Sequence, residues 1–358
     1  MAAIRVLIAE DSSTVRELLG AIIGGDPRFK VVGVATNGLE AVQMAKALKP
    51  DVITMDIQMP LMDGFEASRE IMIDAPTPIV IVSSHYDVRQ VTVSMQALSV
   101  GALAVHAKPL GPDDPNFVEQ TKEFLRTLHT MSQVHVIRHA RKPGTPISPV
   151  TRIRPSTGAC RAVAIAVSTG GPAALRDMFQ TLPADYSVPV LVVQHISRGF
   201  VEGLAAWLNA VSAVRVKVAV QGERLQPRTV YLAPDDQHLG VTRDGEQVYL
   251  AGDPPIKGFR PSGTYLFESV AKAFGANVVG VIMTGMGDDG VAGLQAIHAA
   301  GGPIIAQDEE SSVVFGMPAR AIDAGLADVV LPLTAIVAQL SKQIANGGAP
   351  APRNDAES

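Results

Sequence analysis

The sequence is poor in cysteine, in aromatic residues and in long apolar runs. Its single cysteine, Cys160, cannot form an internal disulfide, so a disulfide-stabilised secreted domain is excluded and a reducing compartment is expected. The longest apolar runs, such as residues 188–193 and 277–283, fall far short of the roughly 20 residues that cross a bilayer. The first apolar stretch passes directly into Glu10 and Asp11, which a secretory signal peptide would not contain. We therefore expect a cytoplasmic protein that is not inserted in a membrane.

The sequence also lacks an excess of positive charge. The chain has 30 lysine and arginine residues against 35 aspartate and glutamate residues, which gives a formal net charge of -5. A surface devoted to nucleic acid would be basic, so no nucleic-acid partner is expected. Hydrophobic residues make up 47% of the chain, mostly the aliphatic types that are typical of α/β proteins. The length of 358 residues predicts two domains, at about 150 residues per domain.

The first third of the chain alternates between apolar runs and segments of helical periodicity. The runs predict strands at 4–9, 31–35, 52–55, 79–82 and 102–105. Helices are predicted between them, for example at 15–23 and 39–48, and a last helix at about 114–129. Since each helix provides a crossover, the strands should be parallel and covered on both faces. Functional residues are then expected at the carboxyl ends of the strands.

A basic, proline-containing segment separates the two halves of the chain. Between Phe124 and Arg176 there is no aspartate or glutamate, while arginines and prolines accumulate. We interpret residues 129–159 as a solvated linker. Contact with nucleic acid or an acidic partner is the less favoured alternative, because no aromatic residue interleaves with the charges. The predicted domains are therefore 1–128 and 160–345, followed by a disordered tail at 346–358.

The alternation resumes after the linker. Strands are predicted at 162–167, 189–194, 278–283 and 303–306, and helices at 172–181, 200–211 and 291–300. Residues 214–250 instead hold short valine-rich runs and turns such as Asp244-Gly245, which predict a β-hairpin region inserted in the sheet order. Both domains are thus expected to be doubly wound α/β folds with parallel sheets.

Acidic residues gather at the predicted edge of the first sheet. Glu10 and Asp11 follow the first strand, and Asp56 follows the third. Ser83 ends the fourth strand, and Lys108 follows the fifth. Converging carboxylates repel one another unless a cation neutralises them, and such oxygen ligands suit Mg²⁺. The metal would prepare Asp56 to accept a phosphoryl group that Lys108 and Ser83 bind. The alternative, that each acid only caps a helix, does not account for the whole set.

These residues, with the segment 55–64 and the pair Lys108-Pro109, resemble the receiver domain of response regulators over nearly all of residues 1–128. The resemblance implies a flavodoxin-like fold and phosphorylation of Asp56 by a histidine kinase. It also implies Mg²⁺ held by Glu10, Asp11 and Asp56. The sequence departs from the receiver pattern at Val105, where a rotating Tyr or Phe is common, so the sequence does not indicate an aromatic switch.

In the second domain a serine, a histidine and an aspartate each follow a predicted strand. Ser168 opens a Ser-Thr-Gly-Gly-Pro turn, His195 follows strand 189–194, and Asp289 follows strand 278–283. The glycine turn is compatible with phosphate binding and with a serine nucleophile. The histidine and the aspartate favour the nucleophile, because seryl attack needs a base and a carboxylate that orients it. Asp288 competes with Asp289 for that role. The other histidines considered have no comparable neighbours; they are His85, His106, His238 and His298.

Segments around these residues resemble the catalytic domain of the chemotaxis protein-glutamate methylesterases. The segments are 166–172, 193–195, 259–262, 283–290 and 306–318. With the receiver in front, the resemblance covers almost the whole chain and implies a Rossmann-like hydrolytic domain. It implies hydrolysis of glutamyl methyl esters, and glutamine deamidation, on the cytoplasmic helices of chemoreceptors. It further implies activation by a chemotaxis histidine kinase, and no cofactor for the hydrolysis.

The resemblance also implies roles for single residues. Ser168 is the nucleophile, His195 is the base, and Asp289 orients the histidine. Thr169 is a neighbour that holds the histidine, and the backbone amide of Met286 donates to the oxyanion. These assignments carry over residue by residue onto positions that match the family motifs.

The sequence departs from the family at Gly263 and Thr264, where Val-Asp is usual, so a locally different substrate groove is expected.

Two other functions stay open. One is a noncatalytic response regulator whose second domain only binds a partner; the other is a transcription factor, for which no basic recognition helix is evident. We expect a monomer in which phosphorylation of Asp56 weakens docking of the receiver over the Ser168 edge.

Overall fold

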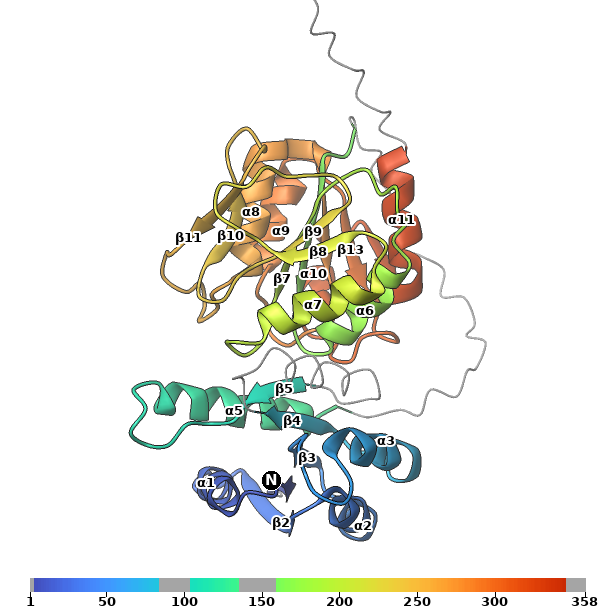
Figure 1. Cartoon of the computed structure of the whole chain (residues 1–358). Coiled ribbons are helices and arrows are strands. Elements are labelled where there is room, and N and C mark those ends of the chain that lie inside the picture. The colour runs from blue at the N-terminus through green and yellow to red at the C-terminus, as the bar shows by residue number, and fades with distance from the viewer. Residues whose placement is uncertain (1–2, 84–103, 135–158, 346–358) are drawn as a thin grey trace, which may run out of the picture. The chain divides into compact units, whose positions relative to one another are not determined.

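The computed structural model describes residues 3–83, 104–134 and 159–345. They form two compact units, each built around a parallel sheet (Figure 1). The predicted tail at 346–358, most of the predicted linker and His85 lie outside the described residues. No helix in the described part of the chain combines the length and the apolar character that crossing a membrane requires.

The first sheet has five parallel strands in the order β2-β1-β3-β4-β5. Its elements are β1 (Ile4–Ala9), α1 (Ser13–Gly24), β2 (Phe29–Ala35), α2 (Gly38–Leu48), β3 (Val52–Met55), α3 (Gly64–Asp74), β4 (Ile79–Ser83), β5 (Ala104–Ala107) and α5 (Phe117–Met131). The strands β3 and β4 are buried along their whole length, which explains their continuous apolar sequences. The predicted doubly wound parallel sheet is confirmed.

The end of the first unit differs from the prediction in two details. The strand β5 covers 104–107 rather than 102–105, and α5 continues to Met131, beyond the predicted domain end at 128. Leu128 and Met131 are both buried. The apolar face of α5 therefore continues into residues that the sequence suggested were linker.

The second sheet has seven strands in the order β14-β13-β12-β6-β7-β9-β8, paired in parallel throughout. Its strands are β6 (Ala162–Val167), β7 (Val190–Gln194), β8 (Arg215–Val218), β9 (Thr229–Leu232), β12 (Val278–Ile282), β13 (Ile304–Gln307) and β14 (Val329–Leu331). Its helices are α6 (Gly171–Gln180), α7 (Val201–Val211), α8 (Gly263–Phe274), α9 (Val291–Ala299), α10 (Met317–Asp323) and α11 (Leu333–Ala345). The central strand is β6, with β12 and β7 as its neighbours.

The predicted insertion is a hairpin only in its second half. The strands β10 (His238–Val241) and β11 (Val248–Ala251) pair antiparallel on either side of Asp244-Gly245. The strands β8 and β9 instead pair in parallel and extend the main sheet. Residues 219–228 connect them, and a connection of that length permits a parallel return that a tight turn would not.

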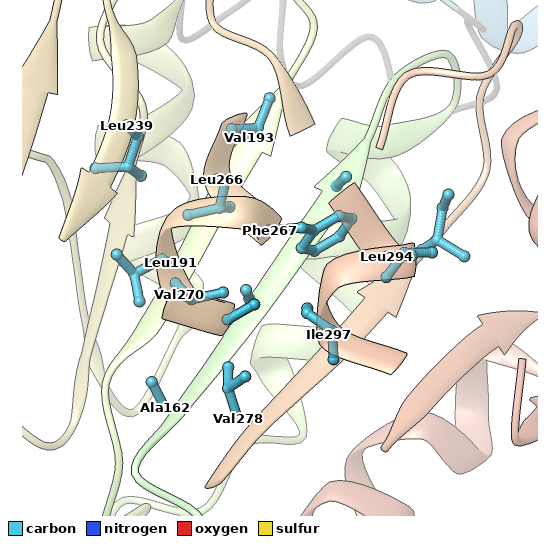
Figure 2. Packing of buried hydrophobic residues seen from close by; sticks show 14 of the residues in the cluster. Ala162, Leu191, Val193, Leu239, Leu266, Phe267, Val270, Val278, Leu294 and Ile297 are labelled. Carbon is cyan, nitrogen blue, oxygen red and sulfur yellow. The ribbon is translucent and has the colours of Figure 1, made fainter. Parts of the chain in front are cut away.

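The core of the second unit holds α8 against the sheet. Leu266, Phe267 and Val270 of α8 are fully buried and belong to one cluster with strand residues such as Leu191 and Val278 (Figure 2). Burying each such side chain stabilises the fold by about 1.5–3 kcal/mol. Helix α9 packs beside α8, whereas α6 packs against α11 (Figure 1). The first turn of α8 is thereby fixed over the carboxyl edge of the sheet.

Candidate functional site

Ser168 and His195 follow neighbouring strands at positions that the sheet register brings together. Val167 and Gln194, the last residues of β6 and β7, are paired, and Ser168 and His195 come directly after them. The backbone N–H of His195 donates to the carbonyl of Val167 at 3.0 Å. On the other side of β6, the N–H of Ser168 donates to the carbonyl of Thr284, after β12, at 3.0 Å. Ser168 therefore lies between the two loops that carry His195 and Asp289.

The side chain of Gln194 joins the serine and histidine segments. It is buried, and its Nε2 donates to the carbonyl of Ser168 at 2.8 Å and to that of His195 at 2.7 Å. One amide thus bridges the backbones of both residues. The role of Gln194 was not predicted from the sequence, although the residue lies within the motif segment 193–195.

His195 and Asp289 form a buried pair. Nε2 of His195 lies 2.9 Å from Oδ2 of Asp289, and their side chains are 11% and 0% exposed. Phe259 stacks on the imidazole, with ring centroids 4.2 Å apart and planes 15° apart. Because a carboxylate only accepts, Nε2 carries the proton and Nδ1 is the acceptor. This Nδ1 is buried and has no hydrogen-bond partner among the described residues.

The beginning of α8 holds the other side of Asp289. Its Oδ1 accepts a hydrogen bond from the hydroxyl of Ser262 at 2.6 Å, and its Oδ2 accepts one from the N–H of Gly263 at 2.6 Å. The N–H of Thr264 lies 3.3 Å from Oδ1. Burial raises the pKa of Asp289, but the hydrogen bond and charge of His195, with the bonds from α8, lower it to about 2. The positive end of the helix dipole acts in the same direction. Asp289 is therefore ionised at neutral pH.

The pair Gly263-Thr264 belongs to this support of Asp289. A Cβ on Gly263 would meet the Cβ of Ala166 at 2.7 Å, so glycine lets α8 approach the central strand. The hydroxyl oxygen of Thr264 accepts a hydrogen bond from the N–H of Gly290 at 2.9 Å. The departure from the family pattern thus falls beside the aspartate.

Asp288 has a different environment. Its side chain is half exposed, and its Oδ2 lies 2.5 Å from Nζ of Lys257. The structure therefore places Asp289, and not Asp288, against the imidazole of His195.

Thr169 and Met286, the other two residues predicted for the catalytic site, lie on segments next to Ser168. In the described part of the chain, Nδ1 of His195 has no hydrogen bond to the Ser168 hydroxyl or to the Thr169 side chain. The carbonyl of Thr169 accepts a hydrogen bond from the hydroxyl of Thr284 at 2.8 Å. Met286 is 44% exposed, and its neighbour Gly285 packs so tightly that a Cβ there would meet the Cβ of Ser168 at 2.6 Å. The loop after β12 thereby carries the Met286 backbone to the serine.

The acidic residues of the first unit gather around Lys108. Its Nζ lies 2.9 Å from Oε2 of Glu10 and 3.0 Å from Oδ2 of Asp56. Burial lowers the pKa of Lys108, but attraction to Asp56 and Glu10 outweighs burial and raises it. For Glu10 and Asp56, burial raises the pKa of each carboxyl despite the nearby lysine. In both carboxyls the cost of burial therefore outweighs the attraction of Lys108.

Glu10, Asp11 and Asp56 could hold a divalent cation. One oxygen from each lies within 4.8 Å of the others; Glu10 and Asp56 are buried and Asp11 is exposed. Carboxylate oxygens with one side open to water suit Mg²⁺. Ser83 is buried at the end of β4, and its carbonyl accepts a hydrogen bond from the N–H of Lys108 at 3.0 Å. Val105, at the position of the aromatic switch, is buried in β5.

The comparisons with known proteins cover both units. A model of the CheB methylesterase family matches residues 163–340, and a model of the response regulator receiver domain matches residues 6–122. Protein-glutamate methylesterase/protein-glutamine glutaminase 4 of Myxococcus xanthus is 48% identical over 96% of this chain and 98% of that protein. The corresponding protein 3 of Anaeromyxobacter dehalogenans is 48% identical over 94% and 98%. The solved catalytic domain of Thermotoga maritima CheB methylesterase is 38% identical, with a TM-score of 0.50, over 51% of this chain and 98% of that chain.

The fold, the two sites and these matches define a response regulator with a receiver domain and a methylesterase domain. The chain belongs to the CheB methylesterase family. The resemblance found in the sequence is thereby confirmed, as is the α/β class of both units.

Proposed function

We propose that the chain is a phosphorylation-activated hydrolase that removes methyl esters from glutamyl residues of chemoreceptors, and deamidates receptor glutamines, in chemotaxis adaptation. The observation that carries this proposal is the buried His195–Asp289 pair, whose imidazole has an acceptor nitrogen available beside the Ser168 turn. Relatives named methylesterase/glutaminase support the choice of ester and amide substrates.

In the first half of the reaction, Oγ of Ser168 attacks the ester carbonyl carbon while Nδ1 of His195 takes the hydroxyl proton. Asp289 stabilises the imidazolium and keeps its Nε2 proton in place. The backbone amide of Met286 donates to the oxyanion, and Thr169 holds the histidine. When the tetrahedral intermediate collapses, the proton on Nδ1 passes to the departing methoxide. Methanol leaves, and the glutamyl group remains esterified to Ser168.

In the second half, water attacks the glutamyl-serine ester and Nδ1 of His195 takes a proton from the water. Collapse of the second intermediate returns that proton to Oγ of Ser168. The products are a glutamate side chain and the free serine. With a glutamine substrate, the same steps release ammonia in place of methanol. Neither half requires a cofactor.

Control is assigned to the receiver. Asp56 accepts a phosphoryl group from a chemotaxis histidine kinase, and Lys108 and Ser83 bind the added oxygens. Glu10, Asp11 and Asp56 hold Mg²⁺, which when bound neutralises charge on the transferring phosphoryl group. The carboxylate oxygens within 4.8 Å of one another support this assignment.

The proposed organisation is a receiver at 1–128, with α5 continuing to Met131 into the linker proposed at 129–159, then a catalytic domain at 160–345 and a tail at 346–358. The proposed partners are the kinase and the methylated cytoplasmic helices of chemoreceptors. The protein is proposed to act in the cytoplasm as a monomer, without a nucleic-acid partner.

Methanol release from membranes that carry methylated chemoreceptors tests the function. The chain supplied with a phosphodonor and Mg²⁺ is expected to release methanol over many turnovers. Stoichiometric receptor binding without methanol would instead support the noncatalytic response regulator. A salt-sensitive shift of DNA would support the transcription factor.

A further inference from the structure

His238 is a buried histidine that the reaction above does not use. It lies at the start of β10, with 0% of its surface exposed. Its Nδ1 accepts a hydrogen bond from the N–H of Ser262 at 3.2 Å, and its Nε2 lies 3.2 Å from the carbonyl of Pro254. Since a carbonyl only accepts, Nε2 carries the proton and Nδ1 is the acceptor. The ring stacks on Tyr265, with centroids 4.7 Å apart, so its orientation is fixed.

Ser262 connects this histidine to the aspartate of the catalytic site. It is the N-cap of α8, and the N–H of a residue that opens a helix has no acceptor within the helix. A buried N–H without an acceptor is unfavourable, so the acceptor must come from another element. His238 supplies it from β10. On its other side, Ser262 donates its hydroxyl to Oδ1 of Asp289 at 2.6 Å.

The position of Ser262 therefore affects the whole support of Asp289. The first turn of α8 provides the hydroxyl of Ser262 and the N–H groups of Gly263 and Thr264 to the two carboxylate oxygens. A shift of Ser262 changes all three contacts together. It also changes the angle at which Asp289 meets Nε2 of His195.

We propose that His238 is a positioning residue for the hydrolysis. By holding the N–H of Ser262, it keeps Asp289 where the carboxylate fixes the tautomer and orientation of His195. The inference rests on the proposed function, because it assigns His238 to the same reaction. It differs from a role in folding alone, since it predicts that one ring nitrogen, Nδ1, governs the reactivity of a histidine on another loop.

Two amide substitutions separate the two nitrogens of His238. In His238→Asn the side-chain oxygen lies near the position of Nδ1 and can accept from Ser262. In His238→Gln the amide reaches the position of Nε2 and can donate to Pro254, while Ser262 loses its acceptor. The full-length chain is supplied with a small-molecule phosphodonor and Mg²⁺, and kcat and KM for methanol release are measured on methylated receptor membranes.

We expect His238→Asn to keep kcat within about threefold of the wild type, because one intact hydrogen bond maintains the geometry. We expect His238→Gln to lower kcat on the order of ten- to a hundredfold, the scale of a small misplacement, with KM unchanged. The thermal midpoints of the two variants should be similar. Equal losses of kcat in both variants, or no loss in His238→Gln, would overturn the proposal.

The proton that Nε2 of His195 shares with Asp289 gives a second readout, which needs no receptor. Its low-field resonance in the proton NMR spectrum should persist in His238→Asn and shift or broaden in His238→Gln. Ser262→Ala keeps the N–H that His238 accepts but removes the hydroxyl that donates to Oδ1 of Asp289, so as a positive control it should move the resonance. If His238→Gln does not fold, His238→Ala, which removes both ring nitrogens, takes its place in the comparison. A resonance that stays unmoved in the folded variant would contradict the proposal.

The two readouts separate failure of this inference from failure of the proposed function. If the wild type releases no methanol, the proposed function is wrong, whereas the resonance still reports whether His238 positions His195. If methanol release is normal but the resonance is insensitive at His238, only the role of His238 is wrong.

Discussion

The two sites of this chain lie at equivalent edges of two parallel sheets, yet their carboxylates have opposite properties. In the first unit, burial raises the pKa of Glu10 and Asp56 although Lys108 lies about 3 Å from both (2.9 and 3.0 Å). In the second, Asp289 is fully buried, and its pKa is nevertheless lowered to about 2. Burial acts in the same direction in both sites, so burial does not explain the difference.

The hydrogen-bond donors around each carboxylate explain it. The side chain of Asp56 accepts a hydrogen bond from the N–H of Ile57 at 2.8 Å and contacts Lys108. Asp289 accepts hydrogen bonds from an imidazole, a hydroxyl and backbone N–H groups at a helix N-terminus. Incompletely compensated carboxylates attract a cation and accept a phosphoryl group. A carboxylate whose oxygens are saturated instead serves as a fixed negative charge that orients its neighbour.

The largest effect is predicted for substitutions of the nucleophile in the second site. Ser168→Ala should reduce methanol release roughly 10⁶-fold, to the background rate, because it removes the attacking oxygen. His195→Ala should act similarly, and the double variant should be little worse, since the residues act as a unit. Ser212→Ala, at a hydroxyl that donates to the carbonyl of Phe179, is a matched control that should keep activity. If Ser168→Ala released methanol near the wild-type rate, Ser168 would not be the nucleophile.

The next effect tests the saturated carboxylate against its neighbour in sequence. Asp289→Asn should lower kcat by about 10⁴-fold, because an amide favours the wrong imidazole tautomer. Asp288→Asn should change kcat little, since its ion pair with Lys257 is half exposed and such pairs contribute about 0–1 kcal/mol. Both rates are measured by methanol release. The reverse ranking would move the orienting role to Asp288.

The need for this test shows where prediction from sequence ended. Ser168, His195 and the Asp288-Asp289 pair were located because parallel strands gather their carboxyl ends at one edge. The family resemblance pointed to Asp289, but the physical reason for that choice lies in tertiary contacts. Lys257 pairs with Asp288, and the first turn of α8 binds Asp289. Those partners lie outside the loop 283–290, so the loop sequence alone does not show them.

Helix α8, which organises the site, was also not predicted from the sequence. The signal was present, with Ser262 as an N-cap and buried residues at helical spacing, namely Leu266, Phe267, Val270, Ala271 and Phe274. It was obscured because Gly263 and Thr264 are poor helix formers. Glycine is required there by the approach to Ala166, a contact between segments that are distant in sequence. The role of His238 was not predicted either, because its hydrogen-bond partner Ser262 lies on another element and is distant in sequence.

A third prediction concerns a truncated chain that lacks the first unit and its acidic site. A chain that begins at Ala159 should release methanol without a phosphodonor, because this truncation removes the receiver to which we assign the inhibition. The full-length chain should be slower by roughly 5- to 150-fold until it receives a phosphodonor and Mg²⁺. Asp56→Asn should stay slow under all conditions. Initial rates for the three proteins decide the matter, and a truncated chain no faster than the unphosphorylated full-length protein would end the inhibition model.

The smallest predicted effect is on the pH dependence of the unfolding free energy, which reports how strongly the hydrogen bonds to Asp289 favour its charged form. Its pKa is about 2 in the folded chain against a usual 3.8, so ionisation of Asp289 contributes about 2 kcal/mol to the unfolding free energy. Because the folded pKa is the lower one, this stability is complete above about pH 4 and is lost as the pH falls towards about 2. Asp289→Asn lacks the titrating group.

Unfolding free energies of the chain from Ala159 and of its Asp289→Asn variant, measured from pH 6 to pH 2, should therefore differ by about 2 kcal/mol at pH 6 and converge in acid. The receiver is left out because the raised pKa values of Glu10 and Asp56 give it the opposite dependence, with stability lost as the pH rises. A difference that stays constant across this range would show that the hydrogen bonds to Asp289 do not favour its charged form. The contrast between the two sites would then rest on geometry alone.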